Sequence, residues 1–180
     1  MRASAPCGAR LPGKRARELR RLFHRRGRGC AAERGGAHRG RGGVAVRIDD
    51  ELILERYRHP HAKGFDGAFD GAAAGDNPFC GDAIEVRVSL GRGAEGVVLE
   101  RAAFDGYACS LCAATADLLM ERARGMAPAA VRALGPDDLL RWWGGLEVGR
   151  TRKGCVELPL SVLKRALDAA EEHAGASLLQ

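Results

Sequence analysis

The clearest hydrophobic pattern in the chain is a strict alternation of apolar and polar residues from Ile84 to Leu90. A period of two places Ile84, Val86 and Val88 on one face and polar residues on the other, which predicts a half-buried strand. A second apolar stretch, residues 97–104, follows a short glycine-rich connection. This connection is too short for a parallel crossover, so the two predicted strands form an antiparallel pair.

Apolar residues recur with helical spacing on both sides of this pair. Upstream, Asp49 or Asp50 can cap a helix that ends before Pro60. Downstream, residues 110–124 predict a second helix, for which Gly125 is the stop signal. The change from a period of two to a helical period marks the end of the predicted sheet.

The C-terminal part of the chain predicts further helices. Residues 128–143 indicate two short helical pieces, separated at Gly135 and Pro136. Residues 158–173 carry an apolar stripe at helical spacing, and Pro159 falls in the first turn, where proline is tolerated. The cysteine at position 155 is thereby expected in a loop just before this helix.

Residues 64–76 are rich in Gly, Ala and Asp, follow neither period, and are predicted to be a loop. The order of elements is therefore one helix, a strand pair and then several helices. This order predicts an α+β domain, with a small antiparallel β-sheet and helices packed on one of its faces. Aromatic residues make up only 5% of the chain, so we expect a small core of Leu, Val and Ala.

Composition changes sharply near residue 48. Residues 1–48 carry 14 Lys and Arg against two Glu, a formal charge of +12, whereas residues 49–180 carry 15 against 21, or −6. The first segment is rich in Gly and Arg and buries too little apolar surface to offset its chain entropy. We expect a basic tail over residues 1–48 and one folded domain over residues 49–175.

Four interpretations of this tail remain open. It is a disordered extension, an arm attracted to RNA or to membranes, a transit peptide, or a segment outside the native protein. The last interpretation places the true start near Val44 or Val46, although no Met occurs between Met1 and Met120.

The charge asymmetry matters for function because the positive net charge of the whole chain, +6, arises from the tail alone. The acidic domain itself gives no argument for nucleic-acid binding. No window approaches about 18 consecutive apolar residues, so no membrane span is expected. The N-terminus also lacks the apolar region of a signal peptide. We therefore expect a cytoplasmic protein whose six cysteines are thiols or metal ligands rather than disulfides.

Three cysteines occupy comparable places: Cys80 precedes a predicted strand, and Cys109 and Cys155 each precede a predicted helix. A helix N-terminus stabilises negative charge, so we expect it to lower the thiol pKa and favour the metal-binding thiolate. Asp82 can add a carboxylate oxygen from the same loop as Cys80. Three thiolates and one carboxylate suit Zn²⁺ or iron. The competing interpretation is that each cysteine is a small buried hydrophobe.

Other polar and aromatic residues have less specific interpretations. Cys112 forms a C-x-x-C motif with Cys109 and is a redox partner, half of a zinc site, a fifth ligand, a sulfur relay or a packing residue. His59 and His61 either visit the metal site or are exposed loop residues. Trp142 and Trp143 either cover the core or contact a partner protein. Three basic residues before Cys155 form either a basic rim of the site or a solvated loop: Arg150, Arg152 and Lys153.

Several short runs resemble the IscU/SufU/NifU N-terminal family of iron–sulfur scaffolds. They are Asn-Pro-Phe-Cys-Gly-Asp at 77–82, Phe-Asp-Gly-Tyr-Ala-Cys at 104–109, Tyr-Arg-His-Pro at 57–60, and Lys-Gly-Cys at 153–155 leading into Leu-Pro-Leu-Ser-Val-Leu at 158–163. The resemblance covers roughly residues 50–170. It implies that Cys80, Asp82, Cys109 and Cys155 are the metal and cluster ligands, and that a pyridoxal-phosphate cysteine desulfurase donates the sulfur.

The chain also departs from the pattern of the family that it resembles. IscU proteins have a histidine directly before the third cysteine, where this chain has Gly154. SufU proteins carry an insertion of about twenty residues between the second and third cysteines, which here are only 46 residues apart. The Leu-Pro-Pro-Val-Lys chaperone-docking motif of IscU is replaced by Gly-Arg-Thr-Arg-Lys at 149–153.

The functional expectation is a scaffold, not an enzyme. It assembles a transient [2Fe–2S] cluster, receives sulfur from a cysteine desulfurase and passes the cluster to client apoproteins. The alternative is a zinc-bound acceptor of persulfide sulfur from the same class of desulfurase, and iron(II) is a further possible occupant. A third hypothesis is a structural zinc domain with a basic nucleic-acid arm.

Overall fold

The structure is a computed structural model that describes residues 50–177. The predicted tail, residues 1–48, lies outside these described residues. Three antiparallel strands form one sheet in the order β1-β2-β3, with β1 at Gly71–Asn77, β2 at Asp82–Gly93 and β3 at Gly96–Tyr107. On β2, every second residue from Asp82 to Val88 is buried, as the alternating pattern predicts.

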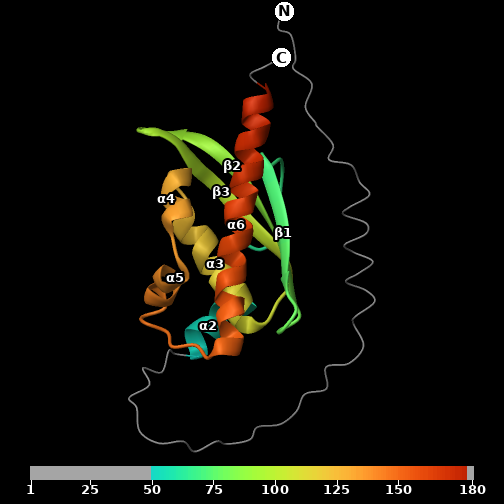
Figure 1. The fold of residues 1–180 in the computed structure, drawn as a ribbon, viewed down its shortest axis with the longest axis vertical. Helices are drawn as coiled ribbons and strands as arrows, with labels where there is room; N and C mark the ends of the chain where they lie inside the picture. The colour runs from blue at the N-terminus through green and yellow to red at the C-terminus, as the bar shows by residue number, and fades with distance from the viewer. Residues whose placement is uncertain (1–49, 178–180) are drawn as a thin grey trace, which may run out of the picture. The chain divides into compact units, whose positions relative to one another are not determined.

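Five helices complete the described part of the chain. They are α2 (Asp50–Arg58), α3 (Ser110–Ala123), α4 (Pro128–Ala133), α5 (Pro136–Trp142) and α6 (Arg150–Ser177). Figure 1 shows α6 running lengthwise along the sheet, with α3 beside it and with α4 and α5 on the side away from β1. The predicted α+β class, with an antiparallel sheet and helices on one face, is confirmed.

The predicted loop at residues 64–76 is wrong in its second half, because Gly71–Asn77 form the edge strand β1. Small residues with low strand propensity are required here because α6 passes directly over this strand. A Cβ atom on Gly71 would lie 2.3 Å from the carbonyl oxygen of Ala166, and one on Gly75 would lie 2.7 Å from Val162 Cγ2. Packing against α6 therefore stabilises a strand in a segment whose small residues have low intrinsic strand propensity.

The predicted start of the last helix is also wrong. Helix α6 begins at Arg150, eight residues before the expected position, and Pro159 lies inside it rather than in its first turn. Proline lacks the N–H that would bond to the carbonyl four residues earlier, here that of Cys155. Burial of Cys155 and Val156, each 1% exposed, favours the additional helical turns.

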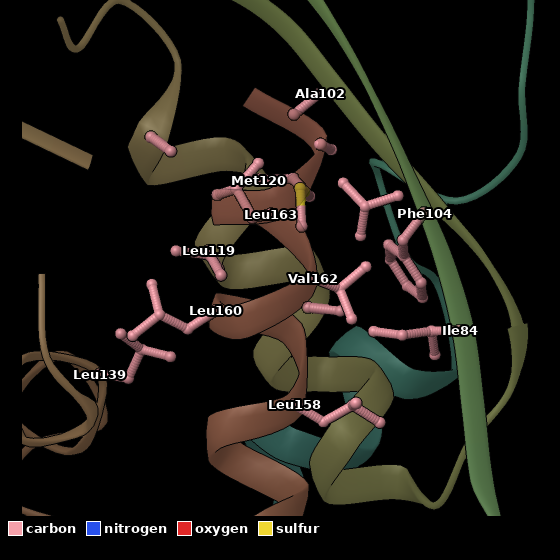
Figure 2. Packing of buried hydrophobic residues seen from close by; sticks show 14 of the residues in the cluster. Ile84, Ala102, Phe104, Leu119, Met120, Leu139, Leu158, Leu160, Val162 and Leu163 are labelled. Atoms are coloured by element: carbon pink, nitrogen blue, oxygen red, sulfur yellow. The ribbon is translucent and has the colours of Figure 1, made fainter. Parts of the chain in front are cut away.

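The core lies between the sheet and the helices α3 and α6. Figure 2 shows Val162 of α6 directed toward Ile84 and Phe104 of the sheet, while Leu160 on another face of α6 meets Leu139 of α5. Helix α6 is thus apolar on two sides and fixes α5 as well as the sheet. The tryptophans were expected either to cover the core or to meet a partner. Trp143 covers the core: it is 5% exposed, and its ring N–H donates to Thr115 Oγ1 at 3.2 Å.

The outer face of the sheet is crossed by a loop, residues 61–70. Its first part pairs with the edge of β3 through a parallel bridge between Lys63 and Phe104. Two arginines on the outer face then lie over two aromatic rings of the loop, each guanidinium carbon 4.2 Å from a ring centre: Arg87 over Phe65 and Arg101 over Phe69. The loop therefore protects one sheet edge and part of the face that the helices leave open.

A buried ion pair joins α2 to α3. Asp117 is fully buried, and its carboxylate accepts hydrogen bonds from Arg56 Nη1 at 2.8 Å and from the backbone N–H of Ala62 at 2.9 Å. Arg56 also contacts Glu121 at 2.7 Å. The pairing satisfies a charge that would be costly to bury alone.

Among residues 50–177, no helix has both the length and the apolar composition needed to cross a bilayer.

Candidate metal centre

Three segments that are distant in the sequence meet at one end of the sheet. They are the turn between β1 and β2, the N-terminus of α3 and the first turns of α6, and Figure 1 shows their ends close together. The turn is tight because the N–H groups of Cys80 and Gly81 both donate to the carbonyl of Asn77. Gly81 adopts φ +71°, a left-handed conformation that glycine tolerates without strain.

Cys80 lies in this turn and is exposed. Its sulfur lies 3.1 Å from Cys155 Sγ and 3.6 Å from the carbonyl oxygen of Thr151. The turn of the sheet and the start of α6 thus bring two thiols into direct contact.

Asp82 is the first residue of β2 and is only 1% exposed. Its Oδ1 accepts a hydrogen bond from the backbone N–H of Cys109 at 2.7 Å, and its Oδ2 lies 3.8 Å from Cys109 Sγ. The carboxylate therefore ties the sheet to the start of α3 and faces a thiol at the same time.

Cys109 is the N-cap of α3, as expected, and its sulfur accepts from the backbone N–H of Cys112 at 3.4 Å. Burial raises the pKa of the Cys109 thiol, and the negative charge of Asp82 acts in the same direction, whereas the Cys112 N–H lowers it. The expected lowering by the helix N-terminus is therefore wrong as a net effect in the metal-free protein. Desolvation of the thiolate outweighs one backbone donor.

Cys155 lies in the second turn of α6 and is 1% exposed, so its predicted position in a loop is wrong. Burial raises the pKa of its thiol, and contacts with Cys80, Asp82 and Cys109 add to the effect. In the absence of a cation, the fold thus favours the protonated thiols of Cys109 and Cys155. A bound cation reverses this preference because it stabilises thiolates directly.

The ligand atoms of Cys80, Asp82 and Cys155 all lie within 4.8 Å of one another. Cys109 joins this group through its contact with Asp82. Three soft sulfur donors and one carboxylate fit Zn²⁺ or the iron of a cluster, and a hard cation such as Mg²⁺ would prefer oxygen ligands. The residues present therefore fit an iron–sulfur or zinc centre.

Cys112 points into the hydrophobic core and is fully buried. Burial raises the pKa of its thiol, and the charges of Asp82 and of the neighbouring cysteines act in the same direction. A neutral thiol in apolar surroundings is a packing residue, so this interpretation is favoured over a ligand or relay.

A second cluster of candidate metal ligands consists of His61, Asp117 and Glu121, whose ligand atoms also lie within 4.8 Å of one another. Arg56 already binds both carboxylates, so a cation there would compete with an internal positive charge. His61 lies 3.7 Å from Asp117 and is exposed, which agrees with its interpretation as a loop residue.

The sequence did not predict the participation of Asn77. This side chain is buried at the end of β1, and its Nδ2 lies 3.7 Å from Cys155 Sγ. The only signal was its place at the start of the Asn-Pro-Phe-Cys-Gly-Asp run, which carried no information on contact with the third cysteine.

Comparisons with known proteins agree with this geometry. The family model described as NifU-like N terminal domain matches residues 48–175. The structure is similar to the crystal structure of a nitrogen-fixing NifU-like protein (N-terminal) from Brucella abortus, with a TM-score of 0.57, 18% identity, and coverage of 69% of this chain and 95% of that chain. No curated protein matches the chain.

A second similar structure is that of a putative iron-sulfur cluster assembly scaffold protein for the SUF system from Fervidobacterium islandicum AW-1. Its TM-score is 0.50 at 21% identity, with coverage of 67% of this chain and 96% of that chain. At these identities the two likenesses establish a shared fold.

Proposed function

Because this chain belongs to the family of NifU-like N-terminal domains, which are scaffolds of iron–sulfur cluster assembly, we propose that it assembles a [2Fe–2S] cluster and transfers it to client apoproteins. Cys80, Asp82, Cys109 and Cys155 are the proposed ligands. The observation that carries this proposal is the meeting of three thiols and a buried carboxylate, drawn from three separate segments, at one end of the sheet.

The chemistry of these residues suits a cluster that is cargo rather than a permanent cofactor. Thiolates bind iron firmly, whereas a carboxylate is a harder and weaker ligand for the same ion. A site with three sulfur ligands and one oxygen ligand holds a cluster well enough for assembly and leaves one iron open to exchange. The thiols lose their protons as metal binds, so loading releases protons.

The sulfur source in this proposal is a cysteine desulfurase. Cys80 is exposed, so a donor can reach it, while Cys155 behind it is buried. Phe79, 91% exposed, directly precedes Cys80, and Tyr107, 67% exposed, lies two residues before Cys109. Exposed aromatic residues of this kind suit a partner surface.

A zinc-bound acceptor of persulfide sulfur is the second candidate. The three ligand atoms within 4.8 Å of one another could surround a single ion, and that compactness favours this function. In this state Asp82 would balance charge and yield its position to an incoming sulfur ligand.

Metal analysis and absorbance separate the two functions. The protein is incubated without oxygen with iron(II), cysteine, a desulfurase and a thiol reductant, which reduces the persulfide sulfur to sulfide, and is then desalted. The scaffold proposal predicts iron and sulfide in equal amounts with visible thiolate-to-iron absorption. Retention of one zinc per chain, with no iron uptake and with label from persulfide found on a cysteine, would instead support the acceptor.

Single substitutions test the ligand set. Changing Cys80, Cys109 or Cys155 to Ser should lower metal affinity by at least about 10-fold, because a hydroxyl stays protonated at neutral pH. Cys112→Ala is the matched control, since it removes a thiol from the same helix that does not face the site. Equal damage from Cys112→Ala and Cys109→Ser would show that the assignment is wrong.

A further inference from the structure

Asn77 stands at the boundary between the metal centre and the sheet. It is the last residue of β1, pairs directly with Asp82 of β2, and is 7% exposed. Because residues opposite each other in an antiparallel pair project to the same face, its side chain lies on the ligand side of the sheet. A polar side chain buried at this place requires hydrogen-bond partners.

The two ends of the Asn77 amide have different partners. Its Oδ1 accepts a hydrogen bond from the backbone N–H of Phe79 at 3.3 Å. A backbone N–H can only donate, so the oxygen must be on that side and the NH₂ group must be on the other. The NH₂ group faces Cys155, with Nδ2 at 3.7 Å from Sγ. The orientation of the donor toward sulfur is thus fixed by the turn.

Room for this amide exists because residue 154 has no side chain. A Cβ atom on Gly154 would lie 2.9 Å from Asn77 Nδ2 and 3.3 Å from its Cγ. Both distances are shorter than normal carbon contacts, so even an alanine would displace the amide from its present place. The position of the Asn77 amide therefore depends on the absence of a side chain at Gly154.

We propose that Asn77 is a positioning residue of the metal centre, whose side-chain N–H donates to the Cys155 sulfur and reduces the electron density that this sulfur gives to a bound metal, while Gly154 keeps the space open. This inference rests on the proposed function, because it requires Cys155 to be a ligand. Hydrogen bonds to ligand sulfurs weaken their donation and raise the reduction potential of a cluster. Cys155 is thereby a weakened donor, as is Cys109, whose sulfur accepts the backbone N–H of Cys112 at 3.4 Å.

The competing explanation is that Asn77 only stabilises the turn through the N–H of Phe79. Asn77→Asp separates the two, since a carboxylate still accepts from Phe79 but has no N–H for sulfur. Gly154→Ala provides an independent test, because it leaves Asn77 in the sequence and only displaces its amide. Asp76→Asn is the matched control, because Asp76 neighbours Asn77 on the exposed face of β1.

The experiment uses Co²⁺ as the probe in the full-length protein. Its thiolate-to-metal charge-transfer absorption moves to lower energy when a bound sulfur becomes a stronger donor. We expect this shift in Asn77→Asp, Asn77→Ala and Gly154→Ala, and an unchanged band in Asp76→Asn. The double variant Asn77→Ala/Gly154→Ala should shift no further than Asn77→Ala.

The outcomes distinguish this inference from the function on which it rests. Bands of Asn77→Asp and Gly154→Ala at the wild-type energy, in variants whose thermal unfolding is normal, would overturn the inference and leave the ligand set intact. If Cys155→Ser left the wild-type cobalt spectrum unchanged, or if wild-type protein gave no thiolate absorption, the ligand assignment and the inference would both be wrong.

Discussion

At the residue scale, Asp82 combines two tasks that are normally separate. It is a candidate ligand, and it also accepts the N–H of Cys109 and so fixes the N-terminus of α3. Because Oδ1 of Asp82 accepts the backbone N–H of Cys109, Oδ2 is the oxygen that remains for a cation. This arrangement presents a weak ligand in a fixed position, so exchange at the metal need not disturb the fold.

Two substitutions of Asp82 separate these tasks. Asp82→Ala and Asp82→Asn should both lengthen the lifetime of a reconstituted cluster in air and slow its transfer to an acceptor apoprotein, because the charged, exchangeable ligand is lost. Only Asp82→Ala should also destabilise the metal-free protein, by about 1–3 kcal/mol, because the Cys109 N–H is left without an acceptor. Unchanged lifetime and transfer rate in both variants would show that the carboxylate is not a labile ligand.

The four candidate ligands could be predicted from short sequence runs, because the chemistry of a thiol depends mainly on residue type. The contact between Asn77 and Cys155 could not be predicted from the sequence, because it depends on glycine at position 154 and on the packing of α6 against β1. The direction of the Cys109 pKa shift was also missed, since burial is a tertiary property.

At the element scale, the contact between α6 and β1 decides how the site is built. Alternation in sequence predicted β2 and β3 because their pattern reflects one buried face. Strand β1 has no such pattern, since close packing against a helix selects for small residues. The early start of α6 likewise follows from burial of its first turns and not from local preference.

Gly71→Ala tests this contact. The added Cβ atom would overlap backbone atoms of α6, which cannot move as a flexible side chain can, so we expect a loss of about 1–3 kcal/mol in the free energy of unfolding. Ala74→Val is the control, because it adds carbon atoms on the exposed face of the same strand. Denaturant unfolding measures both, and equal stability of Gly71→Ala and wild type would contradict the close packing.

Helix α5 provides a pH-dependent test. Asp138 accepts the backbone N–H of Gly135 at 2.7 Å and pairs with Arg141, and these contacts lower the pKa of its carboxyl. A lowered folded pKa means that the contribution to stability is present above the ordinary carboxyl range, near pH 4, and is lost as the pH falls further. Asp138→Asn should therefore be less stable than wild type at pH 7, with the difference shrinking in acid.

Thermal unfolding at several pH values measures this effect. Asp137→Asn, an exposed neighbour in the same turn, is the control and should follow wild type throughout. A difference for Asp138→Asn that persisted unchanged into acid would show that the charge is not responsible.

At the scale of the whole molecule, the buried pair of Arg56 and Asp117 attaches α2, the first helix of the described residues, to the rest of the domain. Arg56→Ala should destabilise the protein by about 3 kcal/mol, because Asp117 is left as a buried charge without its main partner. Arg58→Ala, which removes an exposed arginine two residues later, should have little effect. Similar melting temperatures for both variants would mean that the pair does not hold α2 in place.

The division of the chain near residue 48 is a prediction from composition. A chain that begins at Arg47 should keep its metal content and its melting temperature, because the preceding residues cannot build a core. Metal analysis and thermal unfolding, with the full chain as control, measure this. A large loss of either would show that the first 46 residues belong to the domain.

The proposed ligands also become available one after another during synthesis. Cys80 and Cys155 are in contact although they lie 75 positions apart in the sequence, and Cys155 belongs to the last described helix of the domain. During synthesis the strand pair β2–β3 and helix α3 leave the ribosome before α6 exists, so an emerging chain carries Cys80, Asp82 and Cys109 without their fourth companion. The complete proposed ligand set is thus available only after α6 has been synthesised, so we expect a cluster to be loaded onto the finished domain rather than onto nascent chains.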